Sequence, residues 1–190
     1  MDTVRHSDRR RFVRLPPRSQ RTDIVVFQSA PLEHDIEITG PVVVKLWAST
    51  DGPDTDVTAK LIDQYPPNAD FPGRYDLNID DGIVRARYRN TLTHAEPMKP
   101  GQPAQLTIQL YPTSLLIKAG HRLRLDISSS NFPRFDVNPN TGEPLNANRR
   151  VRTAINAVWL DAAHPSRVRN PRRRESCAGI SVTIPACYFH

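Results

Sequence analysis

Proline is the residue that most restricts how this chain can fold. The sequence has 190 residues, and eighteen of them are prolines, many placed between apolar segments. A proline inside a helix removes a backbone donor and clashes with the preceding turn, so a helical protein would not tolerate this distribution. No window keeps a clean helical apolar period for more than about two turns. The chain is therefore predicted to be built from β-strands.

Apolar and polar residues alternate in most segments between the prolines, as they do in strands with one buried face. In the clearest case Val42, Val44, Leu46 and Ala48 share one side of a strand. The predicted strands cover residues 22–28, 35–40, 42–49, 56–65, 83–89, 104–110, 121–130 and 153–160. Eight short strands joined by turns and proline-rich loops indicate an all-β, antiparallel β-sandwich of the jelly-roll type.

Charge divides the chain into a body and two ends. Residues 22–148 carry a net charge of −5, whereas residues 1–21 carry +5 and residues 149–190 carry +6. Arginine runs outside patterned sequence are usually solvated, so no nucleic-acid partner is predicted. We expect an arginine-rich, disordered lead at 1–21, a jelly-roll domain at 22–167 and a divergent tail at 168–190.

Neither a membrane nor a secretory signal is indicated. No apolar run approaches the roughly 18–20 residues of a membrane-spanning helix, and no apolar stretch follows the first charges. Cys177 and Cys187 both fall in the last fourteen residues, so the sequence predicts no disulfide framework and no zinc site. A cytoplasmic protein without a membrane partner is expected.

The sequence lacks the motifs of the common catalytic sites. It contains no G-x-S-x-G nucleophile elbow and no glycine-rich phosphate loop. His121 opens a strand and is interpreted as a structural histidine that bonds the backbone. Catalytic residues and cofactor sites are predicted to be absent, and no activity is expected from this chain alone.

Two charged clusters need separate interpretations. Asp51, Asp54 and Asp56 have the oxygen ligands of a calcium site, but aspartates also cap turns without metal, so no metal site is predicted. The pair 81–82 (Asp-Gly) predicts a turn before the strand at 83–89. That strand would carry three arginines on one face, which we expect to pair with neighbouring acids.

Five blocks of sequence resemble one family in a fixed order. They are PLEHDIEITGPVVVKLWAST, PDTDVTAKLID, DDGIVRARYR, AGHRLRLDISSSNFPRFDVNPNTGEP and AAHPSR. They resemble the C-terminal domain shared by X-Pro dipeptidyl-peptidases, cocaine esterase, α-amino-acid ester hydrolases and cephalosporin acylases. The resemblance implies a galactose-binding-like jelly roll that follows an α/β-hydrolase domain. That upstream domain carries the catalytic serine, aspartate and histidine of the family, so no catalytic residue is carried over to this chain.

The resemblance also implies a role. In the family this domain packs on the α/β-hydrolase domain, helps to form the substrate cleft and in some members contributes to homo-oligomer contacts. The candidate docking loop consists of Asn131, Phe132, Pro133, Arg134 and Phe135. Phe132 and Phe135 would alternatively plug the end of the sandwich. A second hypothesis is an independent carbohydrate-binding module that uses Trp47 and Trp159, although their positions within strands favour packing.

The chain departs from the family pattern at its C-terminal end. After residues 164–166 (His-Pro-Ser) the family continues with a short apolar strand, whereas this chain continues with an arginine-rich segment at 167–174. The sequence therefore predicts a truncated or split family member. We expect this edge strand to be missing or replaced by residues 180–184 (ISVTI).

Overall fold

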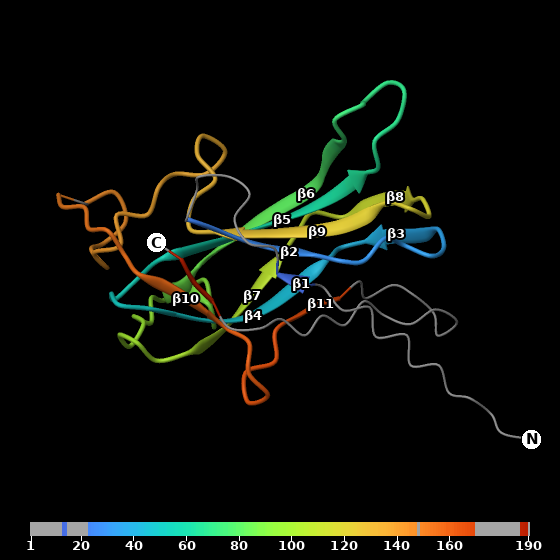
Figure 1. Ribbon diagram of the computed structural model, residues 1–190. Helices are drawn as coiled ribbons and strands as arrows, with labels where there is room; N and C mark the ends of the chain where they lie inside the picture. The colour runs from blue at the N-terminus through green and yellow to red at the C-terminus, as the bar shows by residue number, and fades with distance from the viewer. Residues whose placement is uncertain (1–12, 15–22, 148, 170–186, 190) are drawn as a thin grey trace, which may run out of the picture.

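The computed structural model describes residues 13–14, 23–147, 149–169 and 187–189. Apart from one short 3-10 helix, every regular element in this part of the chain is a strand (Figure 1). The elements are β1 (Val13–Arg14), β2 (Ile24–Gln28), β3 (Ile36–Gly40), β4 (Val43–Thr50), β5 (Asp56–Tyr65), β6 (Tyr75–Arg85), η1 (Ala86–Tyr88), β7 (Ala104–Gln109), β8 (Thr113–Ile117), β9 (Arg122–Ser128), β10 (Asn156–Trp159), β11 (Arg167–Arg169) and β12 (Cys187–Phe189). None of the described residues forms a helix long and apolar enough to cross a membrane.

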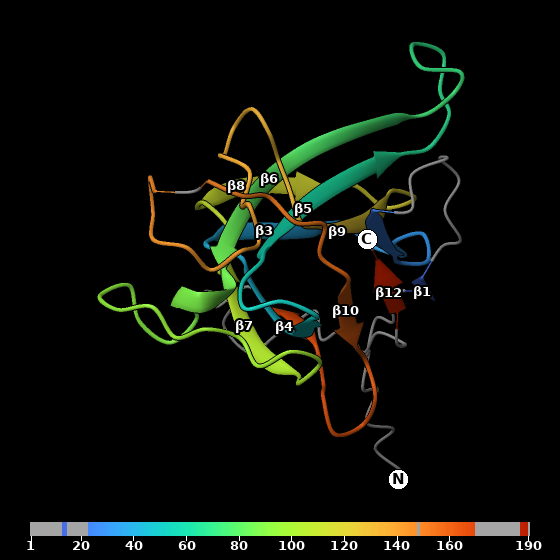
Figure 2. The ribbon, with the colours of Figure 1, turned by 90° about the vertical axis from the view of Figure 1, so that its left-hand side faces the viewer.

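The strands form two main sheets and a separate ribbon. One sheet has the order β1-β2-β9-β5-β6. In the other, β11 and β10 pair with different halves of β4, β12 pairs with β10, and β7 also pairs with β4. The ribbon consists of β3 and β8. Neighbouring strands are antiparallel throughout. Figure 2 shows β5 and β6 on one side of the molecule and β4, β7 and β10 on the other. The predicted antiparallel β-sandwich is confirmed.

The core lies between the two sheets and follows the predicted alternation. Val42, Val44, Leu46 and Ala48 are all at most 2% exposed. On β9 the apolar residues point inward and the charged residues between them stay partly exposed. The largest fully buried side chains are Phe27, Leu46, Leu106, Ile108, Leu110, Ile117, Leu123, Leu125 and Ile127. Burial of apolar surface stabilises the fold by about 25 cal/mol per Å², so these large side chains contribute strongly to stability.

The predicted turn at 81–82 is wrong. Asp81 and Gly82 lie inside β6, where they pair with Lys60 and Ala59 of β5. A Cβ atom at Gly82 would lie 2.7 Å from the backbone oxygen of Gln109, so glycine is needed here because β7 of the other sheet passes close to this position.

The predicted strand at 83–89 is also only partly correct. β6 ends at Arg85, and the chain then turns into η1 (Ala86–Tyr88). Arg85, Arg87 and Arg89 therefore do not share one face of a strand. The pairing of arginine with neighbouring acids is nevertheless observed, as described below.

Two edge strands differ from the predictions. The strand β8 was not predicted, because the segment TSLLI has two adjacent leucines and no period-two alternation. The family's closing strand was expected to be absent, but Arg167–Arg169 forms β11 beside β4, and Val168 is 4% exposed. Its proposed replacement at 180–184 lies outside the described residues.

The close approach at Gly82 leads to a first prediction. Replacing Gly82 with alanine should lower the free energy of unfolding by about 1–3 kcal/mol, because the new Cβ would push apart two packed sheets. Gly73→Ala is the matched control, since a Cβ there meets no atom within 4 Å. Urea titration of both variants measures the difference. Equal stability of the two variants would contradict the packing at this position.

Candidate docking site

The segment that follows β9 contains all five predicted docking residues and lies at one end of the sandwich (Figure 1). Phe132 is 70% exposed, although it is flanked by partly buried Asn131. Phe135 is only partly exposed. The interpretation that both phenylalanines plug the sandwich therefore does not fit Phe132. The ring of Phe132 is therefore accessible to a partner.

The near end of this loop is fixed to the buried carboxylate of Asp81. Asn131 donates a hydrogen bond to it at 3.0 Å, and Arg134 forms an ion pair with it at 2.8 Å. The guanidinium of Arg134 also lies 5.4 Å from the ring centre of Tyr111 and 5.6 Å from that of Phe135. These contacts hold the backbone on both sides of Phe132.

The middle of the loop is held by a buried polar network. The side-chain amide of Asn138 donates to Asp54 at 3.0 Å and to Asp56 at 2.8 Å. Arg87 forms an ion pair with Asp54 at 3.1 Å, and Arg85 donates two hydrogen bonds to Asp56 at 2.9 and 3.0 Å. Such a bidentate pair fixes orientation as well as charge. The loop is therefore tied to the start of β5 and the end of β6.

Burial dominates the electrostatics of this network. Asp54 has no exposed surface, and its desolvation raises the pKa of the carboxyl above its ordinary value. Hydrogen bonds from Asn138 and from the backbone of Arg87 act in the opposite direction and favour the charged form. A carboxylate in this position depends on its partners, because an unpaired buried charge is strongly unfavourable.

Arg87 also reaches the far part of the loop. Its Nη1 donates to the backbone oxygen of Glu143 at 2.7 Å, and the carboxylate of Glu143 accepts from Thr141 at 3.0 Å and from Arg150 at 3.1 Å. The segment after β9 is thus irregular but anchored at several points. The residues of the network were not predicted as part of the site.

The three aspartates considered for calcium are all engaged by arginine. Asp51 pairs with Arg152 at 2.9 Å, while Asp54 and Asp56 pair with the arginines named above. Among the residues that the structure describes, no group of three metal-ligating side chains is present.

Two aspartate–histidine pairs resemble parts of a catalytic triad. Asp63 lies 2.9 Å from Nδ1 of His121, and Asp161 lies 2.8 Å from Nδ1 of His164. In the described part of the chain, no serine hydroxyl is hydrogen-bonded to either histidine, so neither pair has a nucleophile in place. His121 is a buried structural residue, but its ring bonds a carboxylate rather than the backbone.

Both tryptophans pack on the second of these histidines. The ring centres of Trp47 and Trp159 lie 5.1 and 5.3 Å from that of His164. Trp159 also donates to the hydroxyl of Ser49 at 2.9 Å. The rings are occupied in packing and do not form an open platform of the kind that binds sugars.

The described part of the chain is therefore a β-sandwich with an exposed apolar side chain on an anchored loop at one end. The chain belongs to the family described as the X-Pro dipeptidyl-peptidase C-terminal non-catalytic domain, whose sequence profile matches residues 1–169. The family expected from the sequence is confirmed.

Several longer proteins contain a similar region. Cocaine esterase from Rhodococcus sp. (strain MB1 Bresler) is 36% identical over 82% of this chain, which covers 26% of that protein. A putative serine esterase of Mycobacterium bovis (strain ATCC BAA-935 / AF2122/97) is 30% identical over 76% of the chain and 24% of its own length. The structure of an α-amino acid ester hydrolase matches with a TM-score of 0.72 and 34% identity over 77% of this chain and 25% of that protein. The chain thus spans about a quarter of the length of these relatives.

Proposed function

We propose that this chain acts as a docking module that packs on an α/β-hydrolase domain and helps to form its substrate cleft. The observation that carries the proposal is the exposed ring of Phe132 on a loop that is anchored by buried polar groups. Binding residues are often carried on loops that a rigid scaffold holds in position, and this loop is held in that way.

The relatives suggest the kind of hydrolase that would be served. Their names describe two esterases and an ester hydrolase, and each is roughly four times as long as the matched region. We propose that the partner domain supplies the nucleophile, in the same chain or in a separate one. A carbohydrate-binding role gains no support from the two tryptophans.

The remaining sequence expectations stay proposals. We propose a body at 22–167, and the pairing of β11 with β4 favours extending its C-terminal bound to Arg169. A cytoplasmic location and self-association through the same module are also proposed, on the sequence and the family resemblance alone.

The isolated chain should show no hydrolase activity. In assays with p-nitrophenyl esters and with Ala-Pro p-nitroanilide, the hydrolysis rate should equal the uncatalysed rate in buffer alone. The reason is that neither aspartate–histidine pair has a serine hydrogen-bonded to it. Substitution of His164 by alanine serves as a control for residual turnover. Turnover that is abolished by a serine-directed inhibitor would contradict the docking-module proposal.

A further inference from the structure

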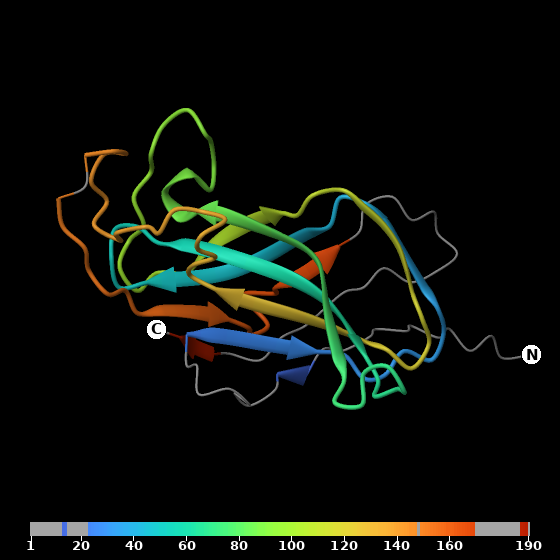
Figure 3. The ribbon, with the colours of Figure 1, turned by 90° about the horizontal axis from the view of Figure 1, so that it is seen from above.

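A pocket of about 450 Å³ lies at the end of the sandwich opposite the docking loop. Figures 1 and 3 both show the β5–β6 connection at one end and the segment after β9 at the other. The pocket lining comes from four separate stretches of chain: Pro31, Gln64, Tyr65, Pro66, Pro67, Gly73, Arg74, Gly120 and Arg122. Neither the family assignment nor the docking role requires this pocket.

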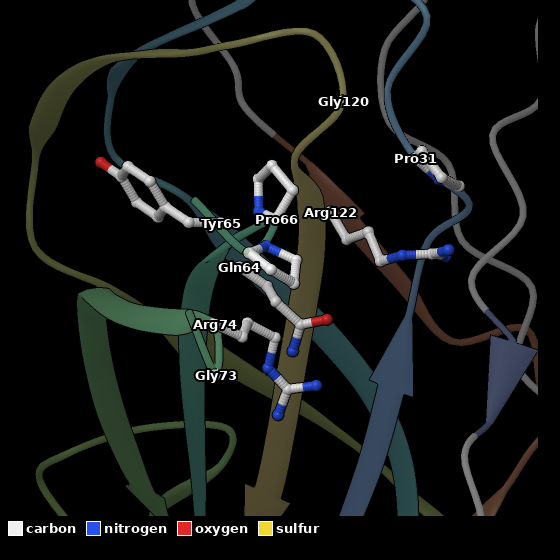
Figure 4. A pocket seen from close by; sticks show the side chains of 9 residues that line it. Pro31, Gln64, Tyr65, Pro66, Gly73, Arg74, Gly120 and Arg122 are labelled. Atoms are coloured by element: carbon white, nitrogen blue, oxygen red, sulfur yellow. The ribbon is translucent and has the colours of Figure 1, made fainter. Parts of the chain in front are cut away.

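The polar part of the lining is cationic. It contains Arg74 and Arg122 and no carboxylate, and Figure 4 shows both side chains around the hollow together with Gln64. Gln28 donates to Oε1 of Gln64, so the Nε2 atom of Gln64 is the one left to donate. Arg74, Arg122 and Gln64 therefore each present hydrogen-bond donors, and no acceptors, to a ligand in the pocket.

The two arginines differ in how far their charge is compensated. Arg74 forms an ion pair with Asp76 at 3.1 Å. The neighbouring Arg124 is also paired, with Asp126 at 2.7 Å. Arg122 donates to the backbone oxygen of Ser29 at 3.0 Å, and no carboxylate of the described residues forms an ion pair with it. Counted over the described residues, the lining is thus left with about one positive charge that no carboxylate pairs, which suits a monoanion.

The other part of the lining is apolar and fixed. The ring of Tyr65 lies 4.2 Å from the ring of His121 and 5.5 Å from that of Tyr75, centre to centre. His121 is in turn held by the buried carboxylate of Asp63. Pro66 lies next to Tyr65, whereas Pro31 lies across the hollow near Arg122 (Figure 4), and neither proline has side-chain rotamers to lose on binding. A preformed apolar wall beside a free guanidinium matches a ligand with a carboxylate and an apolar body.

We propose that this pocket binds a small organic monocarboxylate, with its carboxylate on Arg122 and its apolar part against Tyr65 and Pro66. Arg122 offers a planar pair of donors that fits the two oxygens of a carboxylate. Gln64 completes the recognition with its amide donor. Inorganic phosphate fits less well, because it has no apolar part for the tyrosine and proline wall.

The test uses the full chain and three probes in isothermal titration calorimetry. Sodium benzoate should bind saturably in about the millimolar range, whereas benzamide, which has the same ring without charge, and inorganic phosphate should not. Arg122→Gln should weaken benzoate binding by about tenfold or more, since it removes a charge-assisted bond. Arg169→Gln, an exposed arginine on β11, is the matched control and should bind like the parent.

Four results would overturn the proposal. They are no saturable benzoate binding by the parent chain, equal binding of benzamide, equal binding of phosphate, and unchanged binding by Arg122→Gln. Arg122→Lys keeps the charge but loses the planar donor pair, so its affinity should lie between those of the parent and Arg122→Gln. The comparison of benzoate with benzamide on the parent chain decides the matter even if Arg122→Gln does not fold.

Discussion

Replacing Arg87 with leucine is expected to lower the free energy of unfolding by about 3–5 kcal/mol, as the loss of one member of a buried ion pair does. Arg87 is 5% exposed and is the charge partner of Asp54, which has no exposed surface. The substitution leaves that carboxylate buried with Asn138 as its remaining side-chain donor. It also removes the hydrogen bond to the backbone oxygen of Glu143, so the segment after β9 should become more mobile as well. Urea unfolding followed by tryptophan fluorescence measures the loss.

The pH dependence of this variant distinguishes a buried charge from simple loss of packing. Without Arg87 the pKa of Asp54 in the folded state should rise further above its unfolded value, because the attraction that lowers it is gone. A raised folded pKa contributes stability at low pH that is lost as the pH rises through it. The loss of unfolding free energy caused by Arg87→Leu should therefore be smaller at pH 5 than at pH 8. Arg149→Leu, at an exposed position, should match the parent at both values. A deficit that does not change with pH would contradict this account.

Phe132→Ala is expected to weaken docking by about 2 kcal/mol or more, which is the effect of removing a central aromatic anchor from an interface. The change is best made in a hybrid in which residues 1–169 of this chain replace the matched 26% of cocaine esterase. In the isolated chain the same substitution should cost almost nothing, because the ring is already 70% exposed. The half-life of the hybrid's esterase activity on heating reports the strength of docking.

A second exposed apolar residue provides the control for this prediction. Leu116 lies on β8, away from the docking loop, and is 52% exposed. Leu116→Ala should leave the hybrid's half-life unchanged. Equal effects of the two substitutions would show that the loop is not a preferred contact surface.

The parts of the fold that could be predicted from the sequence are those fixed by local alternation. In residues 42–49 and 121–130 apolar residues alternate with polar ones and form one buried face, so this alternation alone predicts the two strands. Gly82 was misinterpreted because an Asp-Gly pair is a strong local turn signal. Its actual role depends on β7, which no local pattern brings next to it.

The same limit applies to the two sites. The family resemblance and the two phenylalanines predicted the loop at 131–135 as the docking site. They did not predict the hydrogen bonds and ion pairs that anchor it. Asn138 bonds Asp54 and Asp56 from 84 and 82 positions away, and such contacts leave no periodic signal. The pocket beside Arg122 combines stretches of sequence as far apart as Pro31 and Gly120, so it became visible only in the folded chain.

The central proposal is that this chain, a member of a family of non-catalytic C-terminal domains, packs on an α/β-hydrolase domain. The most direct measurement compares three proteins: cocaine esterase, the same enzyme without its matched region, and the hybrid that carries residues 1–169 of this chain. Thermal unfolding and esterase turnover are measured for each. The claim predicts that the hybrid regains the cooperative transition and the turnover that the shortened enzyme lacks. A hybrid that is folded in its added domain but is no more stable or active than the shortened enzyme would contradict it.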